Sequence, residues 1–187
     1  MSIALHPDRV TVLMAGDAAL EGGLAKWGTK DGKHGVGRFW VKVRDASRDS
    51  FAWTVEVPEG GDYEVALSGS GIQTEVDIAS ASDRIVAWVD NGLDRMNDGR
   101  WACEGLPEDE YFSLCGSGWH RMPAGSLRLA AGRQQITLRA RRLGPSFALY
   151  SLELTTPAAA REQASRAARV ASPAGWLADR RYGLQFH

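Results

Sequence analysis

At 187 residues, the chain is long enough for one domain with a full hydrophobic core and a short appendage. Hydrophobic residues make up 44% and charged residues 24%, a composition typical of globular domains and not of disordered ones. The formal net charge is −1 and the arginines are scattered among acidic residues, so neither a nucleic acid nor an anionic membrane is an expected partner. No apolar run is long enough to span a bilayer.

Short alternating segments predict strands along most of the chain. The first two, Val10–Met14 and Arg38–Val43, are separated by glycine-rich connections. The longest alternation, Ser50–Ser68, reads SFAWTVEVPEGGDYEVALS, with a proline and two glycines between its halves. We therefore predict an antiparallel β-hairpin there, with one aromatic face that a second sheet has to cover.

The remaining strands lie on both sides of a long irregular segment, residues 91–118. They are expected at Thr74–Ile78, Ile85–Val89, Ser126–Ala130, Gln135–Arg139 and Phe147–Leu154. About nine strands at short spacing, with no helix between them, predict an all-β fold: an antiparallel β-sandwich (jelly roll). Trp53 and Trp88 lie inside alternating strands, so both are expected in the core.

The composition changes after Pro157. The alanine-rich segment AAAREQASRAARVAS predicts a helix, which Pro173 and Gly175 end. We therefore divide the chain into a sandwich module at residues 1–156, a helical linker at 157–175 and the start of a following domain at 176–187.

The order of these segments resembles carbohydrate-binding modules of the family 6 and family 35 type, which are galactose-binding-like β-sandwiches attached to glycoside hydrolases. The resemblance covers roughly residues 8–156. It rests on SFAWTVEVPEGGDYEVALS, RIVAWVDNG, HRMPAGSLRLAAGRQQITLRA and FALYSLEL in this order. It implies a module whose partners are a glycan ligand and a catalytic domain in the same chain.

The C-terminal segment Trp176–His187, WLADRRYGLQFH, resembles the first strand of the catalytic barrel in family 29 α-L-fucosidases. That family has a W-x-x-x-x-(K/R)-(F/Y)-G-(I/L/M)-x-x-H pattern, in which the closing histidine contacts the sugar. The sequence ends at the matching residue, His187. The resemblance therefore implies the front module of a fucosidase-like glycoside hydrolase.

Sugar binding needs an aromatic face for the C–H side of a pyranose and fixed polar groups for its hydroxyls. In the families that the chain resembles, the usual site lies in loops at one end of the sandwich, and a second site on a concave sheet face also occurs. The candidates in the irregular segment are the aromatic Trp101, Tyr111, Phe112 and Trp119, with Asp94, Asn97, Arg100 and Glu104 as hydrogen-bonding partners. Trp27 and Trp40 flank another glycine-rich loop that could approach the same end.

Each aromatic candidate also has a structural alternative. Trp119 opens a strand and could be a packing residue, and Tyr111 and Phe112 could only anchor the long loop. Trp101 lies in a polar loop, where an exposed indole without a binding role is uncommon. The acidic residues around it form a solvated rim unless they touch a sugar or a metal.

Family relatives often hold a structural calcium through acidic residues in the first and last strands. This sequence has Gly16 in place of the first acid, and Tyr150 and Ser151 where the second is expected. We therefore expect no cofactor, although Asp17, Glu21 and Glu153 remain as oxygen donors for a calcium ion in a different arrangement.

Two cysteines, Cys103 and Cys115, are too few for a structural zinc site. They would form a disulfide if the protein is exported and stay reduced thiols in a reducing compartment. The N-terminus lacks the basic-then-apolar pattern of a signal peptide, so the location is intracellular unless a leader precedes residue 1 in the native protein.

The module is not expected to be an enzyme by itself. The sequence has no G-x-S-x-G nucleophile elbow, and its four histidines show no spacing suited to a metal or a triad. Three hypotheses follow: a carbohydrate-binding module that targets a fucosidase-like hydrolase, a structural domain that braces the catalytic barrel without binding sugar, and a cell-surface adhesion module.

Overall fold

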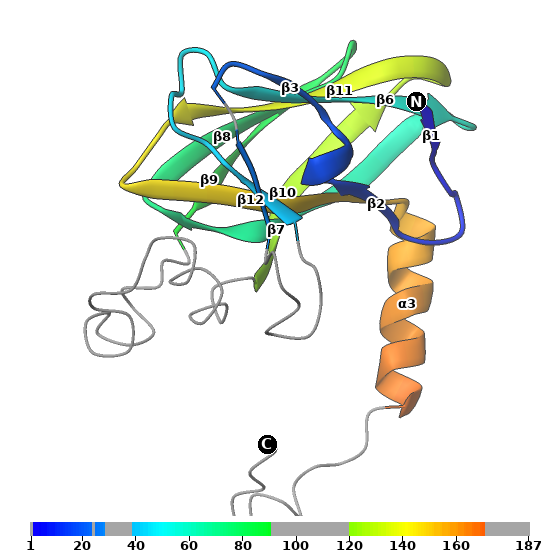
Figure 1. Cartoon of the computed structure of the whole chain (residues 1–187). Coiled ribbons are helices and arrows are strands. Elements are labelled where there is room, and N and C mark those ends of the chain that lie inside the picture. The colour runs from blue at the N-terminus through cyan, green and yellow to red at the C-terminus, as the bar shows by residue number, and fades with distance from the viewer. Residues whose placement is uncertain (1, 24, 29–38, 91–119, 171–187) are drawn as a thin grey trace, which may run out of the picture.

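The computed structural model describes residues 2–23, 25–28, 39–90 and 120–170 as a sandwich of two β-sheets with one helix after it (Figure 1). One sheet, here sheet A, contains β1 (Ser2–Ala4), β3 (Ala19–Glu21), β6 (Ser50–Val57), β8 (Thr74–Ala79), β9 (Arg84–Val89) and β11 (Gly132–Arg142). The other, sheet B, contains β2 (Thr11–Met14), β4 (Ala25–Gly28), β5 (Phe39–Lys42), β7 (Gly61–Ile72), β10 (His120–Leu129) and β12 (Ser146–Thr155). The predicted antiparallel sandwich is confirmed.

The strand orders show how the layers are built. Sheet A runs β1-β6-β11-β8-β9, with β3 also pairing with β6, and sheet B runs β10-β7-β12-β5-β4, with β2 also pairing with β12. All pairs are antiparallel except β1 with β6. The described residues hold twelve strands where about nine were predicted, because β1, β3 and β4 are too short to show a period in the sequence.

The hairpin predicted at Ser50–Ser68 is wrong. Its first half is β6 in sheet A and its second half is β7 in sheet B, so the turn after Val57 carries the chain from one sheet to the other. Alternation shows that each half has one buried face, but it does not show whether the two halves pair edge to edge or face each other across a core. Here the apolar faces of the two halves meet in the interior.

A second connection of the same kind lies beside the first. Strand β10 belongs to sheet B and β11 to sheet A, so the turn at Ala131 also crosses between the sheets. The register places Val57 opposite Gly132 in sheet A and Gly61 opposite Leu129 in sheet B. A Cβ atom on Gly60 would lie only 3.1 Å from the backbone nitrogen of Ala131, which explains a glycine at this close approach.

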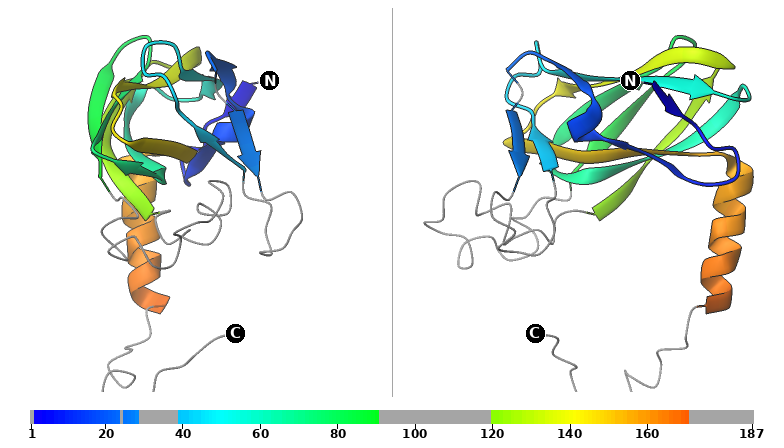
Figure 2. Two further views of the ribbon diagram at one scale, coloured as in Figure 1. Left: turned by 60° about the vertical axis from the view of Figure 1, so that its left-hand side comes forward. Right: turned by 45° about the vertical axis from the view of Figure 1, so that its right-hand side comes forward.

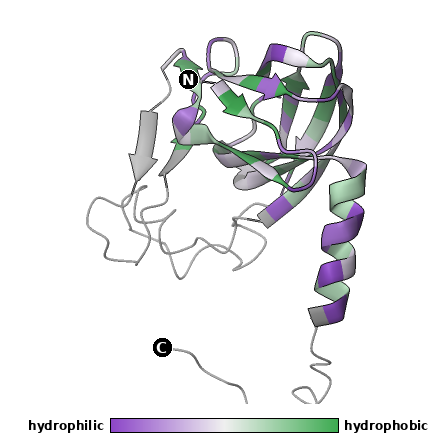
Figure 3. Ribbon diagram, turned by 90° about the vertical axis from the view of Figure 1, so that its right-hand side faces the viewer, coloured by the Kyte–Doolittle hydropathy of each residue, from purple (hydrophilic) through white to green (hydrophobic). Residues whose placement is uncertain are grey.

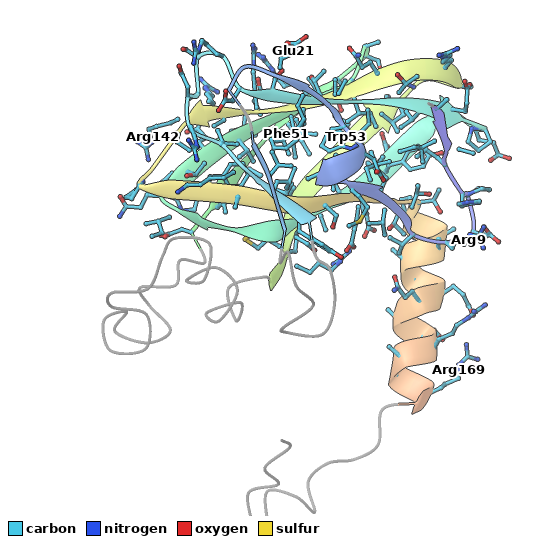
Figure 4. All side chains as sticks on the ribbon, in the orientation of Figure 1. Arg9, Glu21, Phe51, Trp53, Arg142 and Arg169 are labelled. Carbon is cyan, nitrogen blue, oxygen red and sulfur yellow. The ribbon has the colours of Figure 1, made fainter. Side chains whose placement is uncertain are left out.

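Figure 2 shows the two sheets from two further sides. The hydrophobic core is built from side chains of both sheets. Trp53 and Phe51 follow one another on the inner face of β6, with nearly parallel rings whose centroids are 5.8 Å apart. Figure 4 shows both between the layers. From the opposite sheet, β7 contributes Tyr63 and β12 contributes Phe147, each fully buried. Closure of the sandwich therefore depends on aromatic residues from both sheets.

Helix α3 (Pro157–Val170) follows β12 directly and confirms the predicted helix near the C-terminus. Thr156 precedes it, and the Thr156 hydroxyl accepts the backbone N–H of Ala159 at 3.1 Å, as an N-cap does. The same hydroxyl donates to the carbonyl of Pro7 at 2.7 Å and so ties the helix start to the β1–β2 connection. Beyond this first turn the helix leaves the sandwich and carries mixed hydropathy (Figure 3).

None of the helices in the described ranges is long and apolar enough to cross a bilayer.

Candidate functional site

The sugar-binding candidates of the irregular segment lie outside the described residues. These are Asp94, Asn97, Arg100, Trp101, Glu104, Tyr111, Phe112 and Trp119, and the cysteines Cys103 and Cys115 lie there too. Trp27 and Trp40 are opposite one another in the β4–β5 pair, which confirms that the two flank one connection.

The two tryptophans expected in the core have different positions. Trp53 is 1% exposed, as predicted, and its indole N–H donates to the carbonyl of Met14 at 2.9 Å. The prediction for Trp88 is wrong, because its side chain is 50% exposed on the outer face of sheet A. A half-exposed tryptophan on a sheet face is the kind of feature that marks a binding surface.

The alternation of β9 explains the outward position of Trp88. Ala87 and Val89 point inward and are buried, whereas Val86 and Trp88 point outward, with Val86 43% exposed. The sequence Ile-Val-Ala-Trp-Val is apolar at every position, so its period gave no indication of which set was inside. The signal that could have identified it is the small Ala87, which suits the interior beside bulky residues and leaves Trp88 on the other face.

The guanidinium of Arg142 lies over the indole of Trp88. Its central carbon is 5.0 Å from the ring centroid, within the range of a cation–π contact. The register brings the two together across the sheet, since Trp88 is opposite Glu75 on β8 and Glu75 is opposite Arg142 on β11. Arg142 lies at the end of the sandwich far from helix α3 (Figure 4).

A buried carboxylate lies next to this pair on the same face. Asp77 is opposite Val86 in the β8–β9 register and is 5% exposed. Its Oδ2 accepts hydrogen bonds from Arg84 at 2.6 Å and from the more distant Arg139 at 3.5 Å. Its Oδ1 is buried without a hydrogen-bond partner. Such an unsatisfied oxygen is costly to bury.

We define the Trp88 face by these outward-facing residues of β9, β8 and β11: Trp88, Val86, Arg84, Glu75, Asp77, Arg139, Arg141 and Arg142. It combines an exposed aromatic and aliphatic surface with guanidinium groups. The arrangement suits a ligand that has one apolar face and several polar substituents. It holds no activated nucleophile and no pair of exposed carboxylates suited to general acid–base chemistry.

Two of the oxygen donors considered for calcium, Glu153 and Glu21, lie on different sheets and have other hydrogen-bond partners. Glu153 on β12 accepts a hydrogen bond from Arg121 at 2.7 Å, and Glu21 on β3 accepts one from Ser50 at 3.1 Å. These two strands belong to different sheets. In the described part of the chain, no three Asp, Glu, His or Cys side chains come together in a group that could hold a metal ion.

Asp49 is a buried carboxylate with a structural role. It is 1% exposed and accepts three backbone N–H groups, from Arg44 at 2.8 Å and from Asp45 and Gly23 at 2.9 Å each. Burial alone would raise the pKa of the Asp49 carboxyl, but the three hydrogen bonds stabilise its charged form more, so its pKa lies below the usual value. The carboxylate therefore joins the connection before β6 to the end of β3.

The comparisons with known proteins concern the fold. No protein-family model and no curated protein matches the sequence. Among solved structures, the sandwich is similar to the carbohydrate-binding module CBM6cm-2 of Cellvibrio mixtus lichenase 5A in complex with cellotriose. The two are 17% identical with a TM-score of 0.52, and the match covers 78% of this chain and 96% of that one. It is also similar to the C-terminal CBM6 of LamC from Zobellia galactanivorans, with 12% identity and a TM-score of 0.53 over 79% and 100% of the two chains.

A third similar structure is a larger enzyme. The GH26-CBM35 β-(1,4)-mannanase of Podospora anserina matches 79% of this chain with 16% identity and a TM-score of 0.51, but this chain spans only 28% of its length. At such identities the similarity concerns architecture alone. The chain therefore has the β-sandwich fold found in these modules.

Proposed function

We propose that this chain is a non-catalytic carbohydrate-binding module and that the Trp88 face is one of its glycan-contacting surfaces. The single observation that carries the proposal is the half-exposed indole of Trp88 on a sandwich whose fold is shared with sugar-binding modules. An indole on the outer face of sheet A adds nothing to the packing of the core. A pyranose ring, by contrast, can stack on it.

The chemistry of the face supports this use. The exposed part of the Trp88 ring and the neighbouring Val86 offer an apolar strip to the C–H side of a sugar. Arg84 and Arg139, which border Asp77, offer N–H donors to the sugar oxygens. Binding is expected to be weak, because one stacked ring and a few exposed hydrogen bonds must offset the freedom lost on association.

The loop candidates stay part of the proposal as a separate contact region. Trp101, Tyr111 and Trp119 would supply aromatic platforms, and Asp94, Asn97, Arg100 and Glu104 would supply hydrogen bonds. Trp88 precedes this segment closely in the sequence. Replacing Trp88 and Trp101 one at a time would show which region binds.

The direct test is a titration followed by tryptophan fluorescence and calorimetry, with fucosylated, galactosyl, xylan-type and uronic-acid oligosaccharides. Binding of at least one class at millimolar sugar, lost in Trp88→Ala, is expected. Val12→Ala is the matched control, because Val12 is a similarly exposed apolar residue, at 45%, on β2 of sheet B. No response to any class in the unaltered protein would contradict the proposal.

We further propose that the module serves an attached fucosidase-like catalytic domain. The support is the sequence WLADRRYGLQFH at Trp176–His187, which follows helix α3. The test compares a full-length protein with a version that lacks residues 1–156, using a small fucoside and a fucosylated polysaccharide. Deletion should lower hydrolysis of the polysaccharide and leave hydrolysis of the small fucoside unchanged.

A structural role is the second candidate function. It is favoured by helix α3, whose residues 161–169 are all exposed, and by a groove of about 290 Å³ at its base. The groove is lined by Asp8, Arg9, Val10, Ala159, Glu162, Gln163 and Arg166. In this role, removal of the module would lower the melting temperature of the full-length protein, and Trp88→Ala would change neither stability nor glycan binding.

A further inference from the structure

We infer that the Trp88 face selects sugars that carry an oxyanion, either a carboxylate or a sulfate, over their neutral counterparts. The inference rests on the proposed function and specifies the ligand class for the same surface. It follows from which charged atoms of the face are exposed and which are covered.

The cations of this face are more exposed than its anions. Among its ion pairs, Arg84 and Arg139 have side chains 57% and 58% exposed, whereas their shared partner Asp77 has a side chain 6% exposed. Arg141 is 63% exposed and its partner Glu75, at 3.2 Å, is 30% exposed. A ligand that approaches the Trp88 face therefore meets mainly guanidinium N–H groups.

The exposed charged groups of the Trp88 face are mainly hydrogen-bond donors. A guanidinium donates and never accepts, and the carboxylates that could accept are already paired or buried. A neutral sugar hydroxyl both donates and accepts, and on this face its O–H donor would stay with water because few exposed acceptors are available. An oxyanion only accepts, and so it matches a surface that offers mainly donors.

Arg142 offers a place for such a group beside the stacking platform. Its guanidinium is held over the Trp88 ring at 5.0 Å, and no carboxylate of the described residues forms an ion pair with it. A guanidinium fixed in this way can bind a carboxylate or sulfate through two parallel N–H···O bonds while the sugar ring contacts the indole. The face carries four arginines and two carboxylates, whereas the whole chain has a formal charge of −1.

Not every arginine–carboxylate pair of the sandwich has an acid that is much less exposed than its arginine. Arg128 on β10 pairs with Asp62 at 2.9 Å, and there the acid is also exposed, at 49%. That pair presents donors and acceptors together. Arg128→Gln is therefore a matched control for Arg142→Gln, because each substitution removes one exposed guanidinium.

The experiment uses calorimetry with two matched pairs of probes on the whole chain: oligogalacturonate with its full methyl ester, and a sulfated galactan oligosaccharide with its desulfated form. At least one anionic probe should bind about tenfold more tightly than its neutral counterpart, and the preference should shrink as salt is raised. Arg142→Gln should remove most of that preference, and Arg128→Gln should leave it unchanged. The two pairs distinguish carboxylate from sulfate.

The outcomes separate the inference from the proposed function. If neutral probes bind as well as anionic ones and binding still requires Trp88, glycan binding stands and oxyanion selection is wrong. If no anionic probe binds, the inference is wrong, and the proposed function is contradicted as well if the fucosylated and xylan-type oligosaccharides also fail to bind. If single-stranded DNA of equal charge binds as tightly as the anionic sugars, the face is a general polyanion surface and the inference is overturned. Thermal melting of each variant confirms that it is folded.

Discussion

The indole N–H of Trp53 donates to the backbone carbonyl of Met14 at 2.9 Å and so connects the two sheets through the core. Trp53 belongs to β6 of sheet A, whereas Met14 ends β2 of sheet B. The bond satisfies a donor that would otherwise be buried without a partner, since Trp53 is 1% exposed.

Trp53→Phe should destabilise the sandwich by about 1–3 kcal/mol, because it removes the hydrogen bond to the Met14 carbonyl and part of the ring. Trp53→Ala should cost about 3–5 kcal/mol, because it also creates a large cavity. Urea unfolding followed by circular dichroism measures both. Equal stability of Trp53→Phe and the unaltered chain would show that the hydrogen bond contributes nothing.

Trp88→Ala should change the free energy of unfolding by no more than about 1 kcal/mol, because the side chain is half exposed and its contact with Arg142 is a surface cation–π contact. The same substitution should abolish glycan binding at the Trp88 face. Urea unfolding and calorimetric titration of one preparation give both values. A loss of stability as large as that of Trp53→Ala would identify Trp88 as a packing residue.

Asp49→Asn should cost about 2 kcal/mol, because the neutral amide is a weaker acceptor for the three N–H groups around it. The folded-state pKa of Asp49 is lowered, so its stabilisation is fully present above its unfolded-state pKa of about 4 and is lost as the pH falls through the folded-state value. Unfolding should therefore be less sensitive to acid in Asp49→Asn. Glu64→Gln, at an exposed carboxylate on β7, is the control for the loss of one negative charge.

Thr156→Ala should loosen the attachment of helix α3. It removes the cap of the Ala159 N–H and the bond to the Pro7 carbonyl, each a hydrogen bond of the Thr156 hydroxyl. The expected cost is about 1–2 kcal/mol, confined to the first turn of the helix. Hydrogen exchange should show faster amide exchange in α3 while the strands keep their protection. Thr156→Ser retains the hydroxyl and should restore the slow exchange.

The architecture and most of the strands follow from local sequence patterns. The regular alternation in Ser50–Val57 and Gly132–Arg142, together with turn residues at short intervals, required half-buried strands and hence two packed layers. The alanine-rich segment after Pro157 predicted helix α3 for the same local reasons. These features depend on each segment alone.

Two further features were decided by the tertiary structure. The turn after Val57 carries the chain to the opposite sheet, and in the apolar run Ile85–Val89 of β9 the side of Ala87 faces the core while Trp88 faces outward. A period of two shows that a strand has two sides, but which partner it pairs with and which side is covered depend on packing between segments far apart in the sequence. The Trp88 face, assembled from β8, β9 and β11, exists only after that pairing.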